Sequence, residues 1–143
     1  MTAATDDVLL DVAGGIARLR INRPAQRNAL SASVFSGLRE GVAAVARDDS
    51  ARVLVLEGAG DTAFCAGGDL REMAADGDAL QAHRNRGMLA ELFGDLWQLG
   101  KPTIARVHAW MTRGESRTDF ASAAAEWTFI ASARCRRRSR SSS

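Results

Sequence analysis

The order of apolar and polar positions predicts two strands near the start of the chain. Apolar-rich runs at Val8–Val12 and Ile16–Ile21 are separated by Gly14 and Gly15. Two such runs joined by a glycine turn are typical of a β-hairpin. Pro24 follows the second run. Because proline has no amide hydrogen to give to a ladder, we expect the second strand to end before it.

The next stretch has the period of a helix. Val34, Leu38, Val42 and Val45 recur at spacings of four, four and three, which puts them on one helical face. Ser31 precedes this stretch, and a serine oxygen commonly accepts a backbone N–H of the first helical turn. We therefore expect a helix with Ser31 as its N-cap and one buried stripe.

Two later runs predict buried strands, with two helices between them. Arg52–Glu57 is apolar on both faces, as in the interior of a covered sheet, and Thr103–Val107 is a second short buried run. Between them we expect a short helix from Asp69 to about Ala75 and a longer amphipathic helix over Leu80–Leu99, which Gly100 ends. The apolar side of the longer helix comprises Leu89, Leu92, Phe93, Leu96 and Leu99. Hairpin, helix, strand, two helices and strand together indicate the α/β class.

The pattern changes after His108. Ala109–Ala131 has no sustained apolar period and predicts at most a weak helix. Arg134–Ser143 contains only Arg, Ser and one Cys, a composition typical of disorder. We therefore divide the chain into a folded part over residues 1–108 and an Arg/Ser-rich tail over residues 109–143.

Composition narrows the class of protein. The 143 residues are 46% apolar and 25% charged, as in an ordinary globular domain. Neither a membrane-spanning run nor a signal peptide is recognisable, so we expect a cytoplasmic protein without a membrane partner. Cys65 and Cys135 suggest no disulfide frame, and His83 and His108 lack partners at ligand spacing. We therefore expect no metal site.

The charge is unevenly distributed. Residues 1–108 carry 12 basic and 14 acidic side chains, whereas residues 109–143 carry 7 and 3. Five arginines lie between Arg134 and Arg140, enough for salt-sensitive contact with RNA or DNA. Because no folded nucleic-acid motif accompanies them, we expect no specific nucleic-acid partner. A tail that contacts nucleic acid remains an alternative hypothesis.

The strongest chemical signal is Phe64–Leu70, which follows the buried run at Arg52–Glu57. Gly67 and Gly68 form a turn that opens the helix expected at Asp69. Backbone N–H groups at a helix start lack intrahelical partners, and glycine lets a ligand approach them closely. This arrangement is how a protein builds half of an oxyanion hole.

Three blocks of the sequence resemble the enoyl-CoA hydratase/isomerase, or crotonase, family. Ile21–Pro24 with Arg27–Leu30 is similar to the first CoA-binding segment of that family. Phe64–Leu70 is similar to its central oxyanion motif, and Gly100–Ala105 to the strand that leads into its second glycine-rich block. The resemblance implies that residues 1–108 are a partial crotonase-like domain, the N-terminal half of an α/β fold known as the ββα spiral.

The resemblance also implies roles for individual residues. Gly68 corresponds to a catalytic oxyanion donor, through its N–H. CoA-contacting positions correspond to Arg27, Ala29, Leu30, Ala66, Gly67, Asp69 and Leu70. A cation at position 27 also suits a CoA phosphate on its own account. The implied partner is an acyl-CoA substrate of fatty acid metabolism. CoA enters as part of that thioester and no other cofactor is implied. Family members are homo-trimers or hexamers, and act as lyases or isomerases.

The likeness stops after His108. There the family continues with a glycine-rich block that gives a second oxyanion donor, and then with catalytic glutamates. Here Gly114 stands alone, and we interpret Glu115 and Glu126 as solvated charges. We therefore expect the tail to result from a frameshift or truncation, and the chain to be catalytically impaired. Alternatives are a non-catalytic CoA-binding remnant and a fragment that does not fold by itself.

Overall fold

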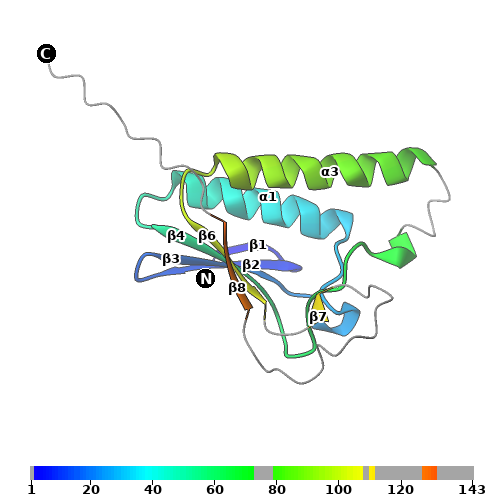
Figure 1. Ribbon diagram of the computed structural model, residues 1–143, viewed down its shortest axis with the longest axis horizontal. Helices are drawn as coiled ribbons and strands as arrows, with labels where there is room; N and C mark the ends of the chain where they lie inside the picture. The colour runs from blue at the N-terminus through cyan, green and yellow to red at the C-terminus, as the bar shows by residue number, and fades with distance from the viewer. Residues whose placement is uncertain (1, 73–78, 108–109, 112–126, 132–143) are drawn as a thin grey trace, which may run out of the picture.

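The main element of the fold is a six-stranded mixed sheet with two helices on one face (Figure 1). The computed structural model describes residues 2–72, 79–107, 110–111 and 127–131. The strand order is β1-β2-β3-β4-β6-β8. These strands are β1 (Thr2–Thr5), β2 (Val8–Ala13), β3 (Ile16–Ile21), β4 (Val53–Gly58), β6 (Thr103–Val107) and β8 (Trp127–Ala131). The helices are α1 (Ala32–Arg47) and α3 (Ala79–Gln98). The predicted α/β class is confirmed.

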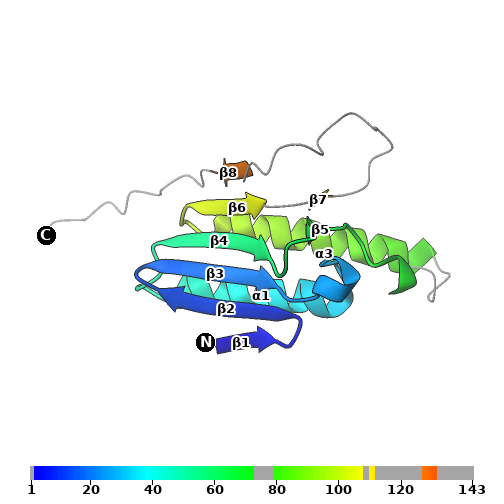
Figure 2. The same cartoon turned by 90° about the horizontal axis from the view of Figure 1, so that it is seen from below.

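The hairpin is confirmed, and it forms one side of the sheet. β2 and β3 pair antiparallel from Val8↔Ile21 to Ala13↔Ile16. Both turn glycines have positive φ, 59° at Gly14 and 85° at Gly15, a conformation that favours glycine. β3, β4 and β6 then run parallel, as Figure 2 shows. Their carboxyl ends consequently meet at one edge of the sheet.

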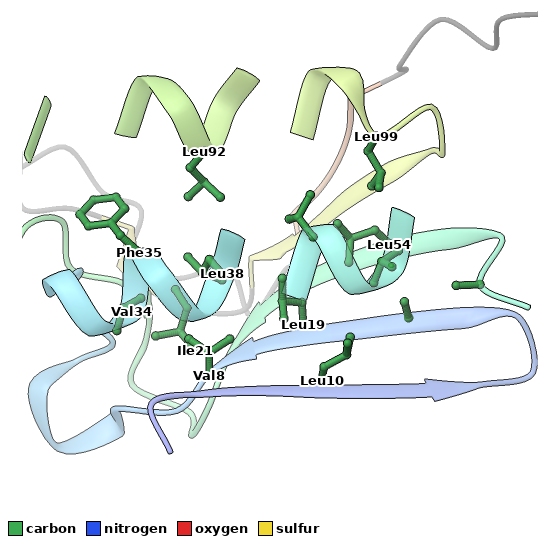
Figure 3. Packing of buried hydrophobic residues seen from close by; sticks show 14 residues of the cluster. Val8, Leu10, Leu19, Ile21, Val34, Phe35, Leu38, Leu54, Leu92 and Leu99 are labelled. Carbon is green, nitrogen blue, oxygen red and sulfur yellow. The ribbon is translucent and has the colours of Figure 1, made fainter. Parts of the chain in front are cut away.

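Helix α1 forms as its sequence predicts. The Ser31 Oγ accepts a hydrogen bond from the Val34 N–H at 3.3 Å. The predicted stripe of Val34, Leu38, Val42 and Val45 is buried. Figure 3 shows Val34 and Leu38 of this stripe close to Val8 and Ile21 of the sheet. Its neighbours in the core include Val8, Leu10, Leu19, Ile21, Leu54, Leu92 and Leu99.

Helix α3 also occupies its predicted place, but its apolar stripe is narrower than expected. Leu92 and Leu99 are buried, and Leu89 and Leu96 pack partly against the core. Phe93 is 61% exposed, so its predicted position on the buried side is wrong. Because successive residues of a helix are about 100° apart, Leu92 and Phe93 cannot both face a single neighbouring helix. Gly100 ends the helix with φ +71°.

The sequence pattern did not indicate several of the strands. β1, β5 (Ala63–Cys65), β7 (Trp110–Met111) and β8 were not predicted. The weak helix expected over Ala109–Ala131 is wrong where that stretch is described, because both of its described parts are strands. β8 is a strand because it pairs antiparallel with β6. A pairing between segments this far apart in the chain leaves no periodic pattern in the local sequence. A 3₁₀ turn over Pro24–Gln26 was also missed.

Other expectations fall on parts of the chain beyond the described residues. Helical backbone covers residues 70–72, and the remainder of the short helix expected to reach Ala75 lies outside them. Arg134–Ser143 lies outside them as well, so the division after His108 stays a prediction. No helix within the described part of the chain is long and apolar enough to span a membrane.

Lys101 fixes the connection between α3 and β6. Its Nζ donates to the carbonyl oxygens of Val45 and Asp48, both at 2.6 Å. These carbonyls belong to the C-terminal end of α1, where a positive charge is favourable. The lysine therefore ties the start of β6 to α1.

Glu57 is a buried carboxylate on the face of the sheet opposite the helices. It accepts a hydrogen bond from Arg20 Nε at 2.9 Å and another from Arg106 Nη1 at 3.2 Å. Burial alone would raise the pKa of Glu57, but the two guanidinium groups outweigh burial and lower it. The triad joins β3, β4 and β6, because the register aligns Arg20 with Glu57 and Glu57 with Arg106.

We expect Gly41→Ala to destabilise the protein. An added Cβ would lie 2.3 Å from Cδ1 of Leu19, which is completely buried under α1. Overpacking of this kind costs about 1–3 kcal/mol, more than alanine returns through its helix propensity. Gly94→Ala is the matched control, because its Cβ would meet nothing within 4 Å. Urea unfolding that shows equal stability for the two variants would contradict the packing argument.

We expect Glu57→Gln to lower the free energy of unfolding at pH 7 by about 1–3 kcal/mol, the usual worth of charged hydrogen bonds. A carboxylate with a lowered folded-state pKa stabilises fully above its ordinary value of 4.5, and loses this effect as pH falls towards the folded-state value. The difference between wild type and Glu57→Gln should therefore shrink below pH 4.5. Urea unfolding between pH 7 and 3 measures it, with the exposed Glu40→Gln as control. A difference that stays constant over that range would refute the role of the ionised form.

Candidate active site

Two loops meet at the carboxyl ends of the parallel strands. One leaves β3 at Ile21 and reaches Ser31, the N-cap of α1. The other leaves β4 at Gly58, forms β5 and turns at Gly67 and Gly68. In α/β sheets the crevice at this edge is the usual place for a ligand.

Backbone hydrogen bonds join the two loops. The Leu30 N–H donates to the Gly67 carbonyl at 2.8 Å, and the Asp69 N–H donates to the Leu30 carbonyl at 3.0 Å. The Ala66 N–H donates to the Arg27 carbonyl at 3.0 Å. The structure thus brings together two sequence blocks, Arg27–Leu30 and Phe64–Leu70, that are separated by more than thirty residues of chain.

The N–H of Gly68 is free of intramolecular partners within the described part of the chain. The two hydrogen bonds with Leu30 use the carbonyl of Gly67 and the N–H of Asp69, so they hold the Gly68 residue from both sides. Gly67 has a φ of +91° and Gly68 is exposed to solvent. A fixed, exposed and unused N–H is the geometry that an oxyanion donor requires.

Asp69 is buried, and its two carboxylate oxygens have different partners. Oδ1 accepts the Arg71 N–H at 3.1 Å, which caps the helical residues that begin at Leu70. Oδ2 accepts from Arg23 Nη1 at 2.9 Å. Burial would raise the pKa of Asp69, but the hydrogen bonds and charge of Arg23 outweigh it and hold the pKa below its usual value. Asp69 is therefore an ionised structural group at neutral pH.

Asn28 connects the two loops from inside. It is completely buried and has a φ of +56°, next to Arg27 at +52°. Its Nδ2 donates to the carbonyls of Ala59 at 2.9 Å and Ala63 at 2.6 Å, while its Oδ1 accepts the Arg23 N–H at 3.0 Å. Asparagine tolerates the left-handed conformation better than most residues, so it suits both the turn and the hydrogen bonds.

The predicted site residues divide into buried and accessible ones. Ala29 and Asp69 are buried, and Leu30 and Gly67 are half-buried. The accessible positions are Arg27, Ala66, Gly68 and Leu70, and Leu70 is 75% exposed. Ala66, Gly68 and Leu70 lie on the loop after β4, and Arg27 lies beside them on the other loop, because its carbonyl accepts the Ala66 N–H.

Arg23 and Asn28 are the structural residues of the site that sequence reasoning missed. Both stand in blocks quoted for the family resemblance, but neither was assigned a role. The only available signal was the dense polar run between Asn22 and Asn28, since the partners Ala59, Ala63 and Asp69 lie far along the chain.

Cys65 lies beside the turn and is half-buried. Its Sγ accepts the Gly67 N–H at 3.4 Å. Burial raises the pKa of the Cys65 thiol, and this outweighs the opposing effect of that hydrogen bond. A neutral thiol is a weak nucleophile, so at this position Cys65 serves as a small hydrophobic residue. Across the described residues, no three His, Cys, Asp or Glu side chains group as a metal site would need.

We expect Asn28→Ala to destabilise the protein by about 3 kcal/mol or more, because it leaves buried backbone groups unpaired and strains a left-handed position. Asn28→Gly removes the strain but not the loss of hydrogen bonds, and should lie between alanine and wild type. Asn22→Ala is the control, since Asn22 makes an exposed hydrogen bond to the Asp6 carbonyl. Equal urea midpoints for Asn28→Ala and Asn22→Ala would show that the buried amide is dispensable.

Comparison with known proteins finds similarity to an enoyl-CoA hydratase/isomerase family model and to proteins whose names contain a CoA thioester. Residues 11–115 match the family model described as enoyl-CoA hydratase/isomerase. The chain is 37% identical over 78 residues to a mitochondrial 3-hydroxyisobutyryl-CoA hydrolase of Gallus gallus, covering 54% of this chain and 20% of that protein. It is 35% identical over 111 residues to a hydroxycinnamoyl-CoA hydratase-lyase of Pseudomonas fluorescens, covering 75% and 40%.

Solved structures agree with the sequence matches. The crystal structure of an enoyl-CoA hydratase from Bacillus anthracis superposes with a TM-score of 0.69 and 30% identity, covering 72% of this chain and 40% of that one. This chain therefore spans at most 40% of the length of each of these three relatives. The fold is that of the crotonase neighbours, and the chain belongs to the enoyl-CoA hydratase/isomerase family.

Proposed function

We propose that this chain binds an acyl-CoA thioester with its carbonyl oxygen at the N–H of Gly68. The observation that carries the proposal is that N–H itself, exposed and without an acceptor in the described part of the chain, on a backbone held from both sides by Leu30. A thioester carbonyl gains negative charge when an enolate or a tetrahedral intermediate forms. A preorganised N–H donor stabilises this charge, and one such donor contributes roughly 3–4 kcal/mol.

The surrounding residues supply the remainder of the proposed binding site. Arg27 is exposed at the end of its turn, where its guanidinium would pair with a CoA phosphate. Ala66 and Leu70 present small and apolar surface beside Gly68, suited to the pantetheine arm. Ala29, Leu30, Gly67 and Asp69 would shape the site through the backbone and not through direct side-chain chemistry.

The proposed chemistry is restricted to oxyanion stabilisation. After His108 the sequence holds the single glycine Gly114, so a glycine-rich second donor has no candidate there. Glu57 and Asp69, the buried carboxylates of the described part, are both engaged by arginines. General acid–base catalysis needs a carboxylate within reach of the substrate protons. We therefore expect thioester binding and polarisation with impaired turnover.

The assembly of the chain into a homo-trimer or hexamer stays a prediction, and light scattering would measure the oligomeric state.

The names of the relatives fit a donor that serves more than one reaction. One is called a hydrolase and another a hydratase-lyase, and both names contain a CoA thioester. A main-chain N–H recognises the carbonyl oxygen and not the acyl chain. We accordingly assign the proposed function to the thioester and leave the acyl group unrestricted.

The test compares wild type with Gly68→Pro and Gly68→Ala, using crotonyl-CoA labelled with ¹³C at the thioester carbonyl. Proline removes the N–H, whereas alanine keeps it and so separates the loss of the N–H from the bulk of an added side chain. Wild type and Gly68→Ala should shift the infrared carbonyl stretch to lower frequency, and Gly68→Pro should not. The dissociation constant should rise about 5- to 10-fold in Gly68→Pro, the effect of about one hydrogen bond.

Three results would contradict the proposal. Failure of wild type to bind crotonyl-CoA removes the function, and an unchanged stretch in Gly68→Pro removes the donor. Hydration of crotonyl-CoA by wild type above the Gly68→Pro level would refute the impaired turnover. Circular dichroism of each variant shows whether it remains folded.

A further inference from the structure

One guanidinium nitrogen contacts both loops of the candidate site. Nη1 of Arg23 donates to the Ala29 carbonyl at 3.0 Å and to Oδ2 of Asp69 at 2.9 Å. The Arg23 side chain is only 16% exposed and the Asp69 side chain 9%. Solvent therefore screens this interaction much less than it would screen a surface ion pair.

The two contacts lie next to the residues that hold Gly68. Ala29 immediately precedes Leu30 on one loop, and Asp69 immediately follows Gly68 on the other. The hydrogen bonds from Leu30 to Gly67 and from Asp69 to Leu30 run between the same two segments. Arg23 thus fixes the spacing of the segments at the place where the free N–H is presented.

Arg23 is itself held by the scaffold. Its backbone N–H donates to Oδ1 of Asn28 at 3.0 Å, and its carbonyl accepts the Asn28 N–H at 2.8 Å. Its Nε lies 3.7 Å from Oδ1 of Asp7, at the start of the hairpin. The backbone of Arg23 is therefore anchored to the turn that carries Arg27, and its guanidinium lies against the β1–β2 connection.

A shielded ion pair contributes little net stability compared with apolar side chains of the same size, because desolvation offsets much of the attraction. Such a pair does, however, fix the relative orientation of the two segments that it joins. We propose that Arg23, through Asp69 and the Ala29 carbonyl, is a positioning residue that orients the Gly68 N–H towards the thioester carbonyl. The role rests on the proposed function, because it concerns the same donor.

Four variants test the proposal. Arg23→Met removes both hydrogen bonds of Nη1 and keeps an unbranched apolar chain in place of the arginine methylene groups. Arg23→Lys keeps a positively charged donor at the same position. Asp69→Asn keeps the oxygen that caps the helical residues but removes the charge opposite Arg23. Arg39→Met is the control, because Arg39 forms an ion pair with Asp95 that links α1 to α3 away from the site.

The first measurement needs no ligand. Amide hydrogen exchange, read by NMR, should show at least a 10-fold loss of protection at Leu30 and Asp69 in Arg23→Met, beyond any loss at core amides such as Leu54. Arg23→Lys should recover most of that protection, and Arg39→Met should retain it. Unchanged protection in Arg23→Met overturns the proposal, whether or not the protein binds CoA.

The second measurement uses crotonyl-CoA with the ¹³C label. Arg23→Met and Asp69→Asn should lose at least half of the wild-type shift of the carbonyl stretch, and Arg39→Met should keep it. A full shift in a folded Arg23→Met overturns the proposal. If Arg23→Met does not fold, Asp69→Asn decides in the same way. Absence of binding by wild type overturns the proposed function and the positioning role together, whereas loss confined to the variants leaves the proposed function intact.

Discussion

The candidate site depends on the buried carboxamide of Asn28. This one side chain satisfies two carbonyls of the loop after β4 and one N–H of its own loop, so it substitutes for a strand ladder where the two parallel strands have ended. Gly58 is matched to it, since a Cβ there would lie 2.7 Å from Asn28 Nδ2 and 2.3 Å from the Phe64 carbonyl. The loops approach this closely only because position 58 has no side chain and position 28 accepts a left-handed backbone.

A site built from main-chain donors places its sequence requirements on the residues that hold the backbone. Gly68 offers a group that every residue except proline also carries, so its usefulness comes from orientation. Arg23, Asn28 and Asp69 hold together the two loops that carry this backbone, and all three are shielded from solvent. The polar residues of this region therefore serve geometry, and the accessible surface around Gly68 contains few chemically distinctive side chains.

The sequence predicted those parts of the fold that have a local cause. The hairpin follows from Gly14 and Gly15, and α1 from Ser31 and its apolar period. The buried polar contacts have no such cause, because Arg20 and Glu57 are 37 residues apart and Lys101 reaches a carbonyl 56 residues away. The predicted burial of Phe93 was wrong for a related reason. Its period is helical, but only the packing of α3 on α1 decides which of two adjacent apolar residues becomes buried.

The ion pairs of the structure differ in what they do because they differ in exposure. Arg39 meets Glu91 and Asp95 on the outside of the helices, where water and salt weaken the attraction. Glu57 is buried, but the two arginines that contact it are half-exposed, so the screening of this triad by solvent is intermediate. Among the ion pairs of the described residues, only that of Arg23 and Asp69 has both side chains well shielded from solvent. Increasing salt should therefore weaken the helix pairing first and the geometry around Gly68 last, which is the order expected if the shielded pair serves the site and the exposed ones serve only the fold.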